Sequence, residues 1–78
     1  MAATLIKRYS SLYHRFEMKK LKNGYAVSEL AVNKEGEFEI EFRHSGIKSL
    51  FEASAEINAL VRDMEIKNGV TFKVHQAY

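Results

Sequence analysis

TLIKRYSSLYHRFEMKKLKNG, residues 4–24, is the segment that determines which fold the rest of this chain can adopt. At 100° per residue its large apolar side chains fall within an arc of about 120°, as in an amphipathic helix. These side chains are Leu5, Ile6, Tyr9, Leu12, Tyr13 and Phe16. Thr4 is a suitable N-cap, and Asn23-Gly24 is a suitable C-terminal stop. The pattern therefore predicts a helix over residues 4–22.

Two other interpretations of this segment stay open. Tyr13–Lys20 can form a strand that ends in a hairpin turn at Asn23-Gly24, although Lys20 would then share a face with Phe16 and Met18. Thr4–Tyr9 can also form a strand, which gives a ferredoxin-like βαββαβ pattern. Lys7 and Arg8 would then lie in a central strand, and this argues against that pattern.

From Tyr25 onward the period of the sequence changes to two, which is typical of strands. Tyr25–Val32 and Glu37–Phe42 form a predicted hairpin, and Asn33–Gly36 supplies the turn. A three-residue loop places Asn33 opposite Glu37. Leu30 and Val32 then lie on the same face as Ile40 and Phe38.

A second helix is predicted after this hairpin. Ser49 and Glu52 form a capping box, and Lys67-Asn68-Gly69 ends the helix. One face of the helix is apolar. Its members are Leu50, Ala53, Ile57, Leu60, Val61 and Met64. Val70–Val74 then forms a short last strand.

The predicted fold is therefore α+β with the order α-β-β-α-β. Two helices pack on one face of a three-stranded, mostly antiparallel sheet. The alternatives are a β-β-β-α-β meander and a ferredoxin-like fold. The position of the last strand in the sheet stays open, and residues 1–78 form a single domain.

The composition excludes several classes of protein. The chain has no cysteine, so disulfides and thiolate zinc sites are absent. Its apolar runs are too short to span a membrane. The basic residues Lys7-Arg8 are followed by Tyr9-Ser10-Ser11, and not by the apolar stretch of a secretory signal. We expect a cytoplasmic protein that does not act at a membrane.

No arrangement of residues points to catalysis. His14, His44 and His75 lack the spacing of a metal site, and Ser45-Gly46 lacks the context of a nucleophile elbow. The glycines stand singly, so no phosphate-binding loop is present. The sequence predicts neither an enzyme nor a cofactor, a metal or a small-molecule substrate.

The charge of the chain is unevenly distributed. Residues 1–22 hold six basic residues and one acidic residue, whereas the rest holds six basic and nine acidic residues. On the predicted first helix, four cations gather within about 60° of arc, on the side away from the apolar stripe. They are Arg8, Arg15, Lys19 and Lys22. We predict that this face binds an acidic protein surface or a nucleic acid.

The outer face of the predicted sheet is a second candidate surface. It combines apolar and acidic side chains, which are Tyr25, Val27, Ala31, Glu39 and Glu41. The predicted register also places Glu29 opposite Glu41, and like charges across a pair of strands repel. The basic helix of a second copy would relieve this repulsion, so a homodimer is one predicted assembly.

These observations favour a small non-enzymatic binding protein that docks on a macromolecule and modulates it, as an inhibitor or an adaptor. Compact chains without proline or cysteine are common among phage and mobile-element accessory factors, an association that says nothing of mechanism. The alternative is a protein that binds RNA or DNA through the basic N-terminal helix, although it has no known motif for reading bases.

Overall fold

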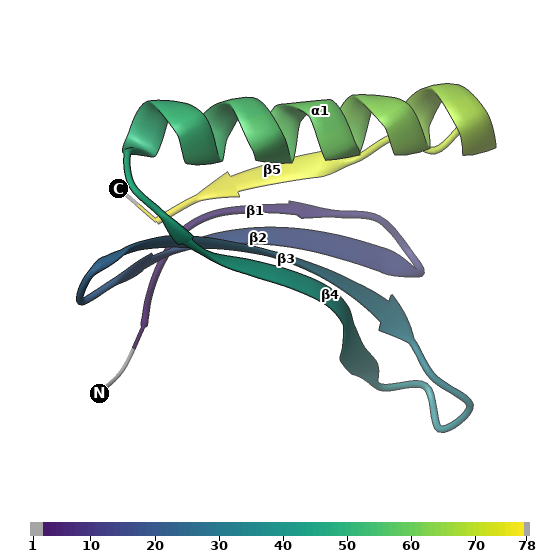
Figure 1. The fold of residues 1–78 in the computed structure, drawn as a ribbon. Helices are drawn as coiled ribbons and strands as arrows, with labels where there is room; N and C mark the ends of the chain where they lie inside the picture. The colour runs from purple at the N-terminus through teal and green to yellow at the C-terminus, as the bar shows by residue number, and fades with distance from the viewer. Residues whose placement is uncertain (1–2, 78) are drawn as a thin grey trace.

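The computed structural model describes residues 3–77, which form one antiparallel sheet with a helix on one of its faces (Figure 1). The strands lie in the order β4-β3-β2-β1-β5. The elements are β1 (Thr4–Ser10), β2 (His14–Leu21), β3 (Gly24–Val32), β4 (Phe38–Ile47), α1 (Leu50–Asn68) and β5 (Lys73–Gln76). The prediction of two helices on a three-stranded sheet is therefore wrong, and so is the ferredoxin-like alternative. The β-β-β-α-β meander differs from the structure by the extra strand β1.

The predicted helix over residues 4–22 is a β-hairpin made of β1 and β2. The turn lies at Ser11, whose N–H donates to the carbonyl of His14 at 2.8 Å. The hydroxyl of Ser11 also accepts from the N–H of His14 at 3.2 Å. Serine side chains bond neighbouring backbone groups in this way and so compete with a helix. Threonine, isoleucine and tyrosine in the segment favour strands as well.

The objection to a strand at residues 13–20 was that Lys20 would share a face with Phe16 and Met18. Lys20 does lie on that face, but its ammonium sits 4.9 Å from the centre of the Tyr25 ring. Its side chain is exposed near the end of the strand, so the charge is not taken out of water. The alternative interpretation of residues 13–20 as a strand is therefore confirmed, and this strand is β2.

Gly24 allows β3 to start beside the end of β4. Its φ is +141°, and a Cβ atom there would lie 2.5 Å from the carbonyl oxygen of Ile47. No larger residue fits this approach of two backbones. The tight turn before it consists of Lys22 and Asn23, because Leu21 is paired with Gly24.

The hairpin of β3 and β4 has the predicted register near its turn. Leu30 is paired with Ile40 and Val32 with Phe38. The N–H of Asn33 donates to the carbonyl of Glu37 at 2.8 Å. Further along, the register shifts between Glu29 and Leu30, whose partners are Phe42 and Ile40. Glu41 has no partner at this irregularity, so the predicted pairing of Glu29 with Glu41 is wrong.

The predicted caps of the helix are confirmed. The hydroxyl of Ser49 accepts from the N–H of Glu52 at 3.1 Å, and Gly69 ends the helix with a φ of 64°. The helix lies over one face of the sheet, with its long axis along the strands (Figure 1). After it, the chain returns as β5, which pairs antiparallel with β1 at the edge of the sheet.

The core lies between α1 and the sheet. Its buried apolar side chains are Phe16, Met18, Val27, Ile47, Ala53, Ile57, Val61 and Phe72. The rings of Phe16 and Phe72 meet edge to face, with their centres 5.6 Å apart. Because the helix covers one face of the sheet, the other face is left without a second layer.

Candidate functional site

We call the sheet face opposite α1 the open face. Side chains alternate between the two faces of a strand, and paired residues on neighbouring strands share a face. Phe16, Met18 and Val27 point to the helix, so their chain neighbours point to the open face. The strands bend away from the helix, which makes the open face concave (Figure 1).

One continuous row of paired residues crosses all five strands on the open face. His75 is paired with Arg8, Arg8 with Glu17, Glu17 with Ser28, and Ser28 with Arg43. A second row runs beside it. Its members are Lys73, Ser10, Arg15, Leu30 and Ile40. Charged side chains from distant parts of the sequence thus meet on one surface.

Glu17 lies at the centre of this surface and is buried. Its carboxylate accepts from Nε of Arg8 at 2.8 Å and lies 3.6 Å from the ammonium of Lys19. The Glu17 side chain is only 8% exposed, whereas those of Arg8 and Lys19 are 34% and 38% exposed. The two cations thus share one carboxylate and keep contact with solvent.

Arg15 lies over an aromatic ring. Its guanidinium carbon is 4.0 Å from the centre of the Phe38 ring, which is the geometry of a cation–π contact. Nε of Arg15 is buried and has no hydrogen-bond partner among the described residues. A buried donor without an acceptor is unfavourable for the folded chain.

The two sides of the sheet differ in their net charge. Five basic side chains belong to the open face by the strand pairings and alternation. They are Arg8, Arg15, Lys19, Arg43 and Lys73. Glu17 is the only acid of residues 3–77 that the pairings place there. Glu29 and Glu39 lie on the helix side, and Glu52, Glu56, Asp63 and Glu65 lie on α1. The open face is therefore strongly basic.

Three of the four cations predicted to bind a partner remain neighbours, although the helix predicted to hold them does not exist. Arg8 faces Glu17, and Arg15 and Lys19 flank Glu17 on β2. Lys22 lies instead in the turn between β2 and β3. Two of the three also form ion pairs with Glu17, so these side chains belong to a preformed ion cluster.

The predicted outer sheet face is wrong because the helix covers the side that was expected to be bare. Val27 is fully buried in the core, and Tyr25 packs against it. Ala31 and Glu39 are paired on the helix side. Glu41 lies at the irregularity of β4. These five residues do not form a common exposed surface.

Sequence reasoning missed Arg43, Ser28 and Lys73 as members of the open face. Extending the alternation of residues 37–42 along β4 would place Arg43 on the face of Glu39, which is the helix side. The irregularity at Glu41 breaks that alternation, and the sequence gives no sign of it. Lys73 joins the surface only because β5 pairs with β1.

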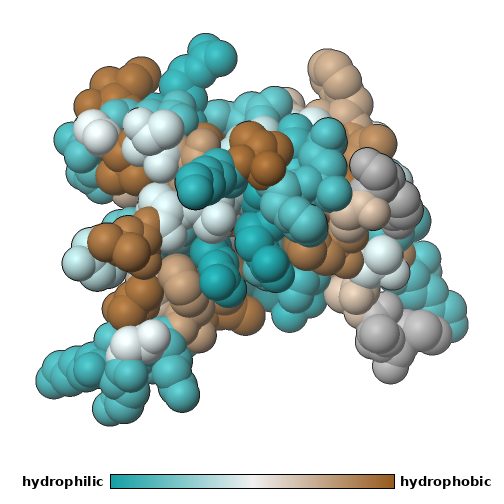
Figure 2. All heavy atoms as spheres, turned by 180° about the vertical axis from the view of Figure 1, so that it is seen from behind, coloured by the Kyte–Doolittle hydropathy of each residue, from teal (hydrophilic) through white to brown (hydrophobic). Residues whose placement is uncertain are grey.

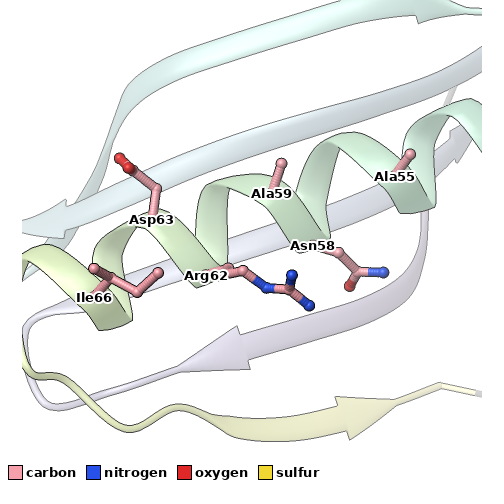
Figure 3. A pocket seen from close by; sticks show the side chains of 6 residues that line it. All are labelled: Ala55, Asn58, Ala59, Arg62, Asp63 and Ile66. Atoms are coloured by element: carbon pink, nitrogen blue, oxygen red, sulfur yellow. The ribbon is translucent and has the colours of Figure 1, made fainter.

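The described residues also form a shallow hollow of about 400 Å³ along α1. Figure 3 shows its lining, in which Asn58 and Arg62 point toward β1 while Ala55 and Ala59 point the other way. The amide oxygen of Asn58 already accepts from the hydroxyl of Tyr9 at 2.8 Å. All six lining residues come from the helix, so no second element encloses a ligand.

Two further findings concern residues 3–77. In that part of the chain, no three histidine or acidic side chains gather as ligands of one metal ion. No helix there has the length and apolar character needed to cross a membrane. Comparison of the chain with protein-family models, curated proteins and solved structures found no match.

Proposed function

We propose that this chain is a non-catalytic binding protein that docks on an anionic macromolecular partner through its open face. One observation supports the proposal above all others: five basic side chains and one paired carboxylate occupy the uncovered side of the sheet. Such a surface speeds the approach of an anionic partner and selects against basic ones.

The shape of the open face also supports docking. A one-sided antiparallel sheet is stable with its second face in water. That face is concave here and has small side chains, Ala26 and Ser28, at its centre. Ala26 and Ser28 are only 1% and 5% exposed, so a convex partner would meet the longer basic side chains of the neighbouring strands and not the backbone of β3.

We propose that the chain acts by occupying a surface of its partner, as an inhibitor or an adaptor does. The absence of cysteine agrees with action in the cytoplasm, where disulfides are rare.

The test is a charge reversal confined to the open face. Arg43 and Lys73 are exposed and make no ion pair with another described residue, so Arg43→Glu with Lys73→Glu should leave the fold intact. The matched control is Lys34→Glu with Arg62→Glu, which changes the net charge equally but lies outside the open face. Binding of a labelled glutamate-rich peptide and of a labelled oligothymidylate is measured by fluorescence anisotropy at low salt.

We expect the open-face variant to lose at least about tenfold more affinity than the control for one or both probes, because local charge complementarity is destroyed. Equal losses for the two variants would show that only net charge matters, and the proposal would fail.

A further inference from the structure

We propose that the natural occupant of the open face is an acidic protein segment that also presents apolar side chains. This inference rests on the proposed function and goes on to specify the chemistry of the partner.

Apolar side chains adjoin the basic part of the open face. Leu30 is paired with Ile40, and Val32 with Phe38. We call these four residues the apolar strip. Ile40 is 56% exposed. The strip lies where β3 and β4 bend away from the helix (Figure 1). In the reverse view, apolar and polar groups alternate along the edge toward the β3–β4 turn (Figure 2).

A nucleic acid would leave this strip without a partner. Phosphates bind cations and not aliphatic side chains, and single strands gain affinity by stacking bases on aromatic rings. Phe38 is the only phenyl ring of residues 3–77 that the strand pairings place on the open face. The guanidinium of Arg15 lies 4.0 Å from the centre of this ring and covers one side of it. The surface therefore offers little to bases.

A second copy of the chain stacked face to face would also fit poorly. Five cations of one copy would lie against the same five cations of the other, and like charges across an interface are unfavourable. A different chain with carboxylates avoids this repulsion.

Carboxylates suit the arginines of the open face. Arginine binds a carboxylate through two parallel N–H bonds. Arg8 uses Nε for Glu17, so that bond does not occupy its terminal nitrogens. The guanidinium of Arg15 makes no ion pair with another described residue, although its Nε is buried and out of reach of a partner. An acidic segment can bond the terminal nitrogens of both arginines while its apolar side chains cover the apolar strip, as an amphipathic helix does in a groove.

The experiment uses three probes of equal charge with the full chain. The first is a helical peptide with glutamates on one side and leucines on the other. In the second, glutamines replace the leucines. The third is a single-stranded oligothymidylate. Each probe is titrated against the unchanged protein, against Ile40→Ser and against Ile66→Ser. Ile66 is 76% exposed on α1 and serves as the matched control.

We expect the glutamate–leucine peptide to bind at least about tenfold more tightly than the other two probes. Ile40→Ser should weaken that peptide about tenfold, because an isoleucine side chain is no longer buried, and should leave the glutamine peptide unchanged. Ile66→Ser should have no effect. Circular dichroism confirms that both variants fold.

Three other results would each contradict this inference in a different way. Tightest binding of the oligothymidylate, unaffected by Ile40→Ser, would assign the face to a nucleic acid. Equal binding of the two peptides would show that the apolar strip takes no part. Sedimentation as a dimer that Ile40→Ser dissociates would assign the face to a second copy. Each of these overturns the inference but leaves the open face as the binding surface. Only equal effects of the open-face and control charge reversals overturn the proposed function itself.

Discussion

The two faces of the sheet hold their side chains by different physical means. On the helix side, Phe16, Val27 and Ile57 are buried in a packed apolar core. On the open face, Glu17 is buried by two basic side chains that remain partly in water. Apolar burial dominates the free energy of folding, whereas solvent-screened ion pairs contribute little. The first face therefore provides most of the stability of the fold, and the side chains of the second contribute little to it.

The largest difference in the free energy of unfolding is expected between variants of two isoleucines. Ile57 lies on α1 and is fully buried against the sheet, whereas Ile40 is 56% exposed on the open face. Ile57→Ala should lower the free energy of unfolding by about 2–5 kcal/mol, since it leaves a cavity in the core. Ile40→Ala should change it by less than about 1 kcal/mol. Urea denaturation measures both values. Equal losses would contradict the division of roles between the faces.

An intermediate loss of stability is expected when the buried carboxylate of Glu17 is removed. Glu17→Gln keeps the shape of the side chain but removes the charge that holds Arg8 and Lys19. We expect a loss of about 1 kcal/mol at low salt, because both cations are about one-third exposed and are screened by solvent. The loss should shrink as salt is added. A loss as large as that of Ile57→Ala would show that the open face is also essential to the fold.

The smallest contribution to stability is expected from the contact between Arg15 and Phe38. A double-mutant cycle with Arg15→Leu and Phe38→Leu should give a coupling of about 0.5–1 kcal/mol, which is typical of a partly exposed cation–π pair. The same Arg15→Leu change should weaken binding of an acidic peptide. A coupling near zero would mean that the ring does not hold the guanidinium in place.

Sequence reasoning predicted the helix and the β3–β4 turn correctly, but it began the last strand at Val70, three residues before the start of β5 (Lys73–Gln76). The helix has sharp local signals at both ends, at Ser49 and Gly69. The turn of the β3–β4 hairpin is equally local, since the side chain of Asn33 accepts from the N–H groups of Glu35 and Glu37. Signals of this kind depend on a few neighbouring residues and not on distant contacts.

The first half was predicted wrongly because its pattern fits two structures. Residues four apart share a side in a helix, and so do residues an even number apart in a strand. Arg15 and Lys19 therefore stay together in either structure. The turn at Ser11 was the missed signal. The pairing of β1 with β5, which completes the open face, depends on contacts across the whole chain and has no local signature.

The side of the sheet that becomes buried was also not predictable from alternation alone. Tyr25 and Val27 alternate with Ala26, Ser28, Leu30 and Val32, and each set contains apolar residues. The helix can cover only one set. The choice follows from Phe16 and Met18 on the neighbouring strand, which were assigned to a helix. The error in the first segment therefore also inverted the assignment of the two faces.

The most direct test of the account uses the isoleucine methyl groups as reporters. The chain has five isoleucines, of which Ile40 lies on the open face and Ile66 lies exposed on the helix. In a methyl NMR titration with the glutamate–leucine peptide, we expect the Ile40 signal to shift or broaden while the Ile66 signal stays in place. A shift of Ile66 with an unmoved Ile40 would contradict the account, because the partner would then bind the helix and not the open face.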